Sequence, residues 1–223
     1  MIVEGKKTRE IDGGDLRELL SPFAGVAVDL GTGDGRFAYR YAAAHPDRFA
    51  IGIDPVAEAM AEMSARALRK TERGGLPNVL YAVASIERMP SELDRIANQI
   101  FVNLPWGSLM RGIILGDDAV LDAVARVARS AATIRIVLNT RIFDDPVPLE
   151  ARDLPDVTPE YVRDTLAPAF ERHRIAIDDA RYLAAEEVAA LETTWAKRLS
   201  QRRPAPSLLI EAHVRTEGID VSS

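Results

Sequence analysis

The sequence predicts an α/β protein whose parallel β-sheet is covered by helices on both faces. Short apolar segments alternate with helical segments five times between residues 26 and 139. A glycine-rich turn, 29–36, follows the first apolar segment. The composition, 47% hydrophobic and 28% charged over 223 residues, is that of a globular chain long enough for one sizeable core. We therefore expect one domain over 1–223, with ligands bound beyond the carboxyl ends of the strands.

The first part of the chain divides into short elements, each with its own pattern. Residues 1–12 have apolar ends around a Gly-Lys turn, which is typical of a hairpin, and 14–23 has weak helical spacing. Beyond them, apolar segments predict strands, and the helices between them are bounded by proline or glycine. The expected strands are 26–31, 49–54, 79–85, 99–105 and 133–139, and the expected helices are 36–46, 55–72 and 117–129.

The chain after residue 139 has a different pattern. The segment 140–157 is a loop rich in proline and aspartate. The following segments predict a helix begun by Thr158 and Pro159, a strand, a second helix and a final strand. They cover 158–173, 174–183, 184–203 and 206–215. Two late strands separated by an insertion indicate an antiparallel edge hairpin added to the parallel sheet.

The charge distribution and the absence of cysteine limit the kinds of function that the protein can have. The chain has no cysteine, which excludes disulfides, thiolate metal sites and cysteine nucleophiles, and we expect no metal. Its N-terminus lacks an apolar signal core and no run of about 18 apolar residues occurs, so we expect a cytoplasmic protein. The net charge of −6 alone argues against a nucleic-acid partner, but two basic islands, 64–75 and 196–203, stand out against it.

The glycine-rich turn indicates a nucleotide-like cofactor. Glycines let the backbone approach a ligand closely, and the start of the following helix offers free N–H groups. The spacing differs from the dinucleotide pattern G-x-G-x-x-G, because the third glycine falls at Gly35 and Arg36 occupies the sixth position. NAD binding is therefore disfavoured, and a purely structural turn stays open as the alternative.

The same turn matches the pattern D-x-G-x-G-x-G. It resembles the first motif of S-adenosylmethionine-dependent methyltransferases of the seven-stranded Rossmann-like type, which implies that fold, with the N-terminal hairpin as an extension, and that cofactor. The resemblance places Asp54 at the ribose hydroxyls and Asp29 at the cationic methionine end. Ser85 and Glu87 lie where this superfamily contacts the adenine. For Glu87, a position on a solvated loop without a role in binding is an equally good interpretation. The implied cofactor-binding residues are Asp29, Gly31, Thr32, Gly33, Gly35, Asp54, Pro55, Ser85, Glu87, Leu104 and Ser108.

The two tryptophans both stand next to features expected at a site. Trp106 follows Asn103-Leu104-Pro105 at the end of the fourth strand. This N-L-P-W segment resembles the N-P-P-Y motif of amino-methylating enzymes, whose aromatic ring stacks on the target base, but has Leu104 for the first proline. Trp195 directly precedes the second basic island. Either ring could simply pack in the core, whereas a pair can sandwich a flipped base, with each face worth roughly 1 to 3 kcal/mol.

A more specific resemblance is to the aminoglycoside-resistance methyltransferases that modify N1 of adenine 1408 in the decoding site of 16S rRNA. It rests on three stretches, LPWGSLMRGIIL, ARALRKTERGGLPNVLY and EEVAALETTWAKRL, and runs from Asp29 to about Leu199. The resemblance implies that Trp106 and Trp195 sandwich the adenine and that Pro105 lies by its N6 edge.

This resemblance also implies a ribosomal partner. The partner is the 30S ribosomal subunit, contacted by a monomer at helix 44 in the decoding region of 16S rRNA. The RNA-facing segments are 64–78, 140–160 and 184–206, and the implied RNA-binding residues are Arg66, Arg69, Lys70, Arg73, Lys197, Arg198, Arg202 and Arg203. The chain departs from the family in its acidic net charge, in five acids within 143–156, and in Pro204 and Pro206. These prolines leave open which C-terminal arginine reaches the nucleotide.

The expected reaction needs no general base. Adenine N1 has its own lone pair at neutral pH, so the protein need only align nucleophile, methyl group and sulfur. The scattered positions of His45, His173 and His213 agree with this. Three alternatives remain open: an exocyclic-amine nucleic-acid methyltransferase, a small-molecule methyltransferase, and an rRNA-binding protein with a vestigial cofactor fold.

Overall fold

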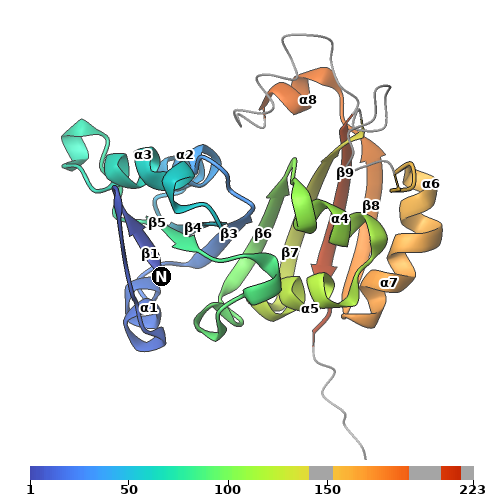
Figure 1. Ribbon diagram of the computed structural model, residues 1–223, viewed down its shortest axis with the longest axis horizontal. Helices are drawn as coiled ribbons and strands as arrows, with labels where there is room; N and C mark the ends of the chain where they lie inside the picture. The colour runs from blue at the N-terminus through green and yellow to red at the C-terminus, as the bar shows by residue number, and fades with distance from the viewer. Residues whose placement is uncertain (141–152, 191–206, 217–223) are drawn as a thin grey trace, which may run out of the picture.

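The structure is a computed structural model that describes residues 1–140, 153–190 and 207–216. The described strands form one sheet in the order β2-β1-β5-β4-β3-β6-β7-β9-β8 (Figure 1). They are β1 (Ile2–Glu4), β2 (Lys7–Arg9), β3 (Gly25–Leu30), β4 (Arg48–Asp54), β5 (Val79–Val83), β6 (Ala97–Asn103), β7 (Ala128–Asn139), β8 (Ile175–Tyr182) and β9 (Ser207–Val214). Strands β3 to β7 run parallel, so their carboxyl ends share one edge of the sheet.

The seven strands β3 to β9 form the expected sheet, and the N-terminal hairpin widens it to nine strands. Strands β1 and β2 pair antiparallel, and Ile2 of β1 lies opposite Ala82 of β5. The predicted hairpin is thus confirmed, and its pairing with β5 makes it part of the sheet. The late antiparallel hairpin is confirmed as well, with β9 between β7 and the edge strand β8. In Figure 1 the arrowheads of β6 and β8 point the opposite way from that of β9.

Most of the described helices fall where the sequence predicts them. They are α1 (Gly13–Leu20), α2 (Arg36–Ala44), α3 (Ala57–Ala67), α4 (Gly107–Leu115), α5 (Asp118–Val127), α6 (Pro159–Tyr161), α7 (Ala167–Arg172) and α8 (Ala185–Ala190). A π-helical turn, Val162–Leu166, joins α6 to α7, and the Thr158 hydroxyl accepts from the Tyr161 N–H as the predicted N-cap. Helix α4 was not predicted, because the Gly107-Ser108 pair that begins it has the composition of a turn.

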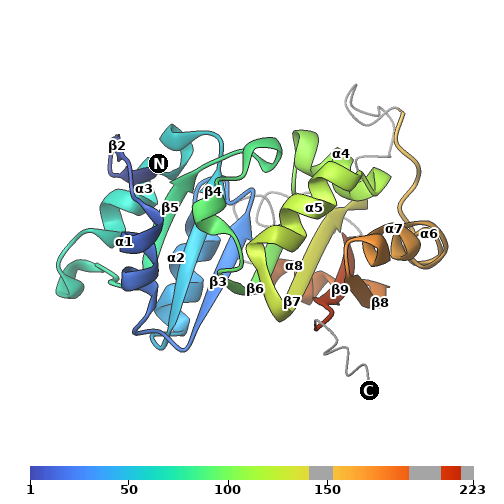
Figure 2. The ribbon, with the colours of Figure 1, turned by 90° about the horizontal axis from the view of Figure 1, so that it is seen from below.

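Two apolar cores cover opposite faces of the sheet. Phe49, Ile51 and Ile53 of β4 belong to the larger core, which includes residues of α4 and α5. Ala50 of the same strand belongs to the second core, with residues of α2 and α3. Since alternate residues of a strand point to opposite faces, the helices cover the sheet from both sides (Figure 2). None of the helices in the described ranges combines the length and apolar character needed to cross a bilayer.

Candidate active site

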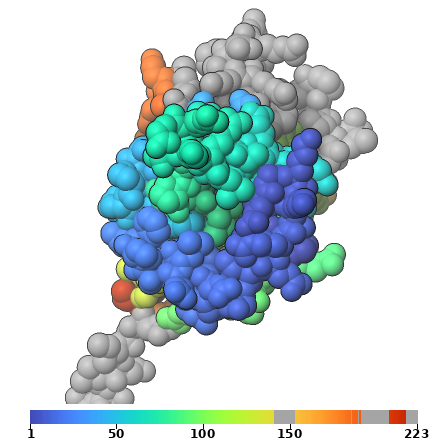
Figure 3. Space-filling view, turned by 90° about the vertical axis from the view of Figure 1, so that its left-hand side faces the viewer, coloured from blue at the N-terminus to red at the C-terminus, as the bar shows by residue number. Residues whose placement is uncertain are grey.

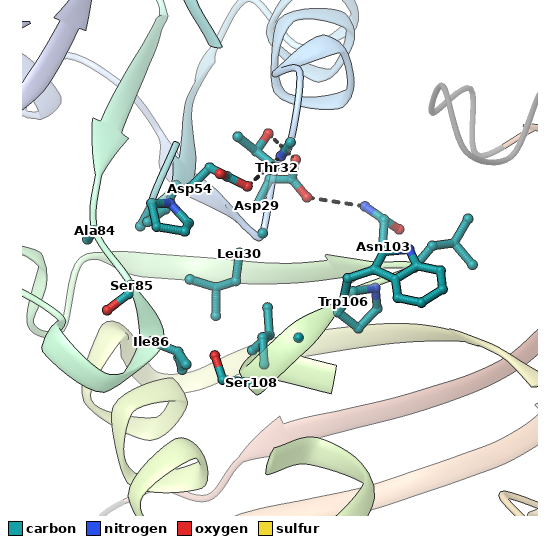
Figure 4. A pocket seen from close by; sticks show the side chains of 18 of the residues that line it. Asp29, Leu30, Thr32, Asp54, Ala84, Ser85, Ile86, Asn103, Trp106 and Ser108 are labelled. Atoms are coloured by element: carbon teal, nitrogen blue, oxygen red, sulfur yellow. Dashed lines mark hydrogen bonds between the residues drawn. The ribbon is translucent and has the colours of Figure 1, made fainter. Parts of the chain in front are cut away.

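A cavity of about 610 Å³ opens at the carboxyl edge of the sheet, where β3, β4 and β6 end (Figure 4). Its volume lies in the range of small-molecule and cofactor pockets. Eleven of the predicted site residues line it: Asp29, Gly31, Thr32, Gly33, Asp54, Pro55, Ser85, Leu104, Pro105, Trp106 and Ser108. Residues that the sequence analysis assigned to the site from four separate segments of the chain therefore line a single cavity.

Asp29, at the end of β3, is the most perturbed acid in this cavity. Its side chain is only 4% exposed, and burial raises the pKa of its carboxyl from 3.8 to about 7. The Thr32 hydroxyl donates to Oδ2 at 2.5 Å and the Asn103 side-chain amide donates to Oδ1 at 3.3 Å. Both hydrogen bonds favour the ionised form but do not offset the burial. A buried carboxylate of this kind is stabilised by a cation, such as the ammonium group of a methionine moiety.

Asn103, at the end of β6, has a buried side-chain oxygen that lacks a partner within the described residues. Its Oδ1 atom is buried and has no hydrogen-bond partner in the part of the chain that the structure describes. A buried acceptor without a donor costs free energy, so the cavity favours a ligand that supplies an N–H group there. An amine beside Asp29 and Asn103 would satisfy both side chains, and S-adenosylmethionine carries such an amine.

Asp54, at the end of β4, anchors the glycine-rich turn. Its Oδ2 accepts from the backbone N–H of Gly33 at 3.0 Å, and its Oδ1 accepts from Val56 at 2.9 Å. Each carboxylate oxygen keeps a further lone pair, because an ionised carboxylate accepts about four hydrogen bonds. The donor set of a ribose, two neighbouring hydroxyls, fits these remaining acceptor positions.

The two later glycines of the turn have different surroundings. Gly33 has φ +58°, and a Cβ atom built on it would meet no atom within 4 Å, so it faces the open cavity. Gly35 has φ +75°, does not line the cavity, and would place a Cβ atom 2.4 Å from the Tyr81 ring. Tyr81 in turn donates its hydroxyl to the Gly35 carbonyl at 3.0 Å. Gly35 thus shapes the turn through its close packing on Tyr81.

Ser85, Glu87 and Ser108 bring the end of β5 against the start of α4. Hydrogen bonds from Ser108, from the Glu87 backbone and from Ser85 hold the pKa of the Glu87 carboxyl below its ordinary value. Glu87 itself is exposed and does not line the cavity, whereas both serines do. The predicted adenine-contacting segment thus lies beside the cavity, which Ser85 lines and Glu87 does not.

The N-L-P-W segment forms the wall of the cavity next to Asn103. Leu104 has φ +53°, and its N–H donates to the Val137 carbonyl at 2.8 Å. Trp106 lines the cavity and is 40% exposed, so its ring is not a core residue. Figure 4 shows the Trp106 ring beside Asn103, whose amide is hydrogen-bonded to the carboxylate of Asp29. A planar ligand that enters from solvent can therefore contact an aromatic face next to the cofactor cavity.

The first basic island begins in the last turn of α3 and continues beyond it, and Figure 3 shows this teal segment on the same face as the blue N-terminal part. Its four cations, Arg66, Arg69, Lys70 and Arg73, are all exposed. The Arg66 guanidinium lies 4.6 Å from the centre of the Tyr39 ring. The Tyr39 hydroxyl also donates to the Gly74 carbonyl at 2.5 Å, so one tyrosine contacts both Arg66 at the end of α3 and Gly74 at the end of the island. The island is therefore held in a defined shape by the protein body.

Several predictions fall outside the described residues. They concern Trp195, Lys197, Arg198, Arg202 and Arg203, which all belong to 191–206, together with the first part of the 140–160 segment.

The sequence pattern did not identify every residue of the cavity. Leu30, Asp34, Phe37, Ile53, Ala84, Ile86, Met89, Asn103, Gly107 and Leu109 also line it. Most of these are apolar and lie inside or next to segments that were assigned to the site. Asn103 had a usable signal, because it is the polar residue that ends a buried strand at the carboxyl edge.

Comparisons with known proteins agree with this geometry. The family model of NpmA, 16S rRNA (adenine(1408)-N(1))-methyltransferase, matches residues 1–214. An enzyme of that name from Streptoalloteichus hindustanus is 39% identical over 201 residues, 90% of this chain and 92% of the relative. The crystal structure of the 16S rRNA methyltransferase KamB superposes with a TM-score of 0.90 at 35% identity, covering 96% of this chain and 100% of that one.

A further solved structure carries the cosubstrate. It is a tryptophan-to-alanine variant of the 16S rRNA (adenine(1408)-N(1))-methyltransferase from Catenulisporales acidiphilia, crystallised with S-adenosylmethionine. It superposes with a TM-score of 0.90 at 34% identity and covers 98% of each chain. The match of the family model over nearly the whole length decides the assignment. This chain belongs to the family of 16S rRNA (adenine(1408)-N(1))-methyltransferases.

Proposed function

We propose that this protein methylates N1 of adenine 1408 in 16S rRNA, with S-adenosylmethionine as methyl donor, and thereby confers aminoglycoside resistance. The observation that carries the proposal is the position of Trp106. Its partly exposed ring lies in the wall of the same cavity that holds the buried carboxyl of Asp29. A binding site for a cationic cofactor and a stacking surface for a base are therefore adjacent.

The protein's own residues supply positioning rather than proton transfer. Asp29 and Asn103 would hold the amine of the methionine moiety, and Asp54 would hold the ribose, which fixes the cofactor at the end of β3 and β4. When bound, S-adenosylmethionine offers an electrophilic methyl group on a sulfonium sulfur. Trp106 would hold the plane of the flipped base so that the N1 lone pair faces this methyl group, which makes the reaction effectively unimolecular.

The same aromatic wall favours the product. Methylation at N1 makes the adenine cationic, and a cation next to a tryptophan face is attracted by the ring. The N6 proton can then be lost to solvent, so the reaction requires no base from the protein. Trp195 is proposed as the second wall of the base pocket, which rests on the family resemblance, because this residue lies outside the described part of the chain.

The substrate is proposed to be the assembled 30S subunit, bound by a monomer at helix 44 of its 16S rRNA, in the cytoplasm. The first basic island supports a structured RNA as partner, since its four cations are exposed and its two ends are held by contacts with Tyr39. A preorganised surface loses less conformational entropy on binding than a flexible one. A small-molecule methyltransferase would have no need of such a surface.

Primer extension across the decoding site tests this function. The purified protein is incubated with 30S subunits and S-adenosylmethionine, and reverse transcriptase is then run through helix 44. Methylation at N1 blocks the Watson–Crick edge, so a new stop at adenine 1408 is expected. Omission of the cofactor is the control. Tight cofactor binding without a new stop would contradict the proposal.

A further inference from the structure

Leu104 has a backbone conformation that its residue type disfavours. It is one of four non-glycine residues in the described ranges with a positive φ, and its value is +53°. Side chains with a Cβ atom rarely adopt this region. The next residue is Pro105, which biases the residue before it toward extended conformations. Two local preferences are overridden at this one position, so the surrounding structure must impose the conformation.

Two contacts of Leu104 hold this conformation. Its N–H donates to the Val137 carbonyl at 2.8 Å, a bond that a proline at the same position could not make. Its side chain is buried in a small cluster with Val137 and Leu209 from the neighbouring strands and with Leu183 and Val188. This cluster is separate from the two cores that cover the faces of the sheet.

The cluster connects the Trp106 wall of the proposed base pocket to α8. Leu104 is followed directly by Pro105 and Trp106, which line the cavity. Val188 belongs to α8, the helix that precedes the segment 191–206 along the chain. A shift of the Leu104 side chain would therefore be transmitted to the Trp106 wall and to α8 together.

We propose that Leu104 is a positioning residue for methyl transfer: its left-handed backbone sets the direction of Trp106, and its buried side chain ties that wall to β9 and α8. The inference rests on the proposed function, because it assumes that Trp106 stacks on the target base. It goes beyond that function by assigning the alignment of the base to an apolar residue that transfers no proton and stacks on no ring.

The test compares Leu104→Ala with two controls. Leu104→Met restores an apolar side chain of similar size, and Leu121→Ala removes the same atoms from the large core on α5, at a residue that does not line the cavity. We expect Leu104→Ala to lower kcat on 30S subunits at least tenfold at saturating cofactor, and to change the Kd for S-adenosylmethionine by a clearly smaller factor, since Leu104 also lines the cavity. We expect Leu104→Met to recover most of the rate and Leu121→Ala to leave kcat unchanged.

A spectroscopic measurement separates positioning from general destabilisation. In a Trp195→Phe background Trp106 is the single tryptophan, so the protein's tryptophan fluorescence measures the solvent exposure of the Trp106 ring alone. We expect Leu104→Ala to change the acrylamide quenching of Trp106, and we expect Leu121→Ala to leave it unchanged. Equal kcat values for the two alanine variants, or a parallel loss of cofactor affinity in Leu104→Ala, would overturn the inference. Absence of the adenine 1408 stop in the wild-type protein would instead overturn the proposed function.

Discussion

The side-chain nitrogen Nδ2 of Asn103 lies 3.3 Å from Oδ1 of Asp29, which links the ends of β6 and β3 inside the cavity. The link uses one end of the Asn103 amide, while its Oδ1 atom stays buried without a partner in the described part of the chain. Asp29 has a carboxyl whose pKa is raised to about 7. The pair is thus an incomplete polar network, and a ligand amine is the group that completes it.

The affinity for S-adenosylmethionine should rise with pH up to about neutrality. The cationic ligand favours the ionised Asp29, and the pKa of about 7 means that this form is scarce in the free protein at lower pH. Below that pKa the affinity should therefore change by up to about tenfold per pH unit. Isothermal titration calorimetry between pH 5.5 and 7.5 measures this change, and proton release near pH 7 should make the binding enthalpy depend on the buffer.

Two variants serve as controls for this pH dependence. Asp29→Asn should bind weakly at every pH with no slope in this range. Asn103→Ala should move the midpoint to higher pH, because the Asn103 amide lowers the pKa of Asp29 in the wild-type protein. A wild-type affinity that stays constant across the range would refute the assignment of Asp29 to the cationic end.

The same group should make the free protein less stable as pH rises. The folded-state pKa of Asp29, about 7, lies above its ordinary value of 3.8, so the folded state binds the proton more tightly. The free energy of unfolding therefore falls between about pH 4 and pH 7 and levels off above. Asp29→Asn should remove this contribution, which urea denaturation of both proteins at pH 5 and pH 8 would show. Equal pH dependence in the two proteins would contradict the burial of an ionisable carboxyl here.

Gly33 and Gly35 should respond differently to the same substitution. Gly33→Ala introduces a Cβ atom into open space. It should therefore lower the free energy of unfolding only by the strain of a left-handed backbone at alanine, about 1–2 kcal/mol. Gly35→Ala adds a contact of 2.4 Å with the Tyr81 ring, which should cost roughly 1–3 kcal/mol more. Chemical denaturation measures the difference between the two variants.

Cofactor titration of these two variants supplies the complementary measurement. Gly33 lines the cavity, so Gly33→Ala should lose more than about tenfold in affinity for S-adenosylmethionine while remaining folded. If Gly35→Ala were the more stable variant, the close packing of Gly35 on Tyr81 would not be a stabilising feature of the turn.

Regular patterns made most of the fold predictable from the sequence. The apolar strands and the D-x-G-x-G-x-G turn located the sheet and its cavity, because buried strands and their glycine turns are encoded locally. Helix α4 was missed since its first residues also suit a turn, although its apolar positions have helical spacing. The nine-stranded width could not be derived, because it depends on one long-range pairing of β1 with β5.

One detail of the site, the backbone conformation of Leu104, depends on tertiary contacts and has no local signal. The positive φ of Leu104 opposes both its own preference and that of a residue before proline, so sequence reasoning would place it in the extended region. The substitution of leucine for the first proline of N-P-P-Y is explained by the same geometry. Proline fixes φ near −65° and lacks the N–H that Leu104 donates to Val137.

The salt dependence of 30S binding should identify which cations of the first basic island contact phosphates. Each phosphate contact contributes about 0.7 to 0.9 to the slope of log K against log salt. Lys70→Ala and Arg73→Ala should each reduce the slope by about this amount. Arg126→Ala is the matched control, because Arg126 pairs with Asp94 at 2.8 Å and lies outside the island. Unchanged slopes in both island variants would exclude this loop as an RNA contact.

Trp106→Ala should abolish methylation of adenine 1408 and leave the affinity for S-adenosylmethionine nearly intact. Loss of one stacking face removes roughly 1 to 3 kcal/mol and also the alignment of N1 with the methyl group, so the rate should fall more than about a hundredfold. Trp106→Phe keeps a smaller aromatic face and should retain part of the activity. The measurements are the reverse-transcriptase stop under single-turnover conditions and calorimetric titration of the cofactor. Full activity of Trp106→Ala would show that its exposed ring does not hold the base, and a parallel loss of cofactor affinity would place the ring in the cofactor site instead.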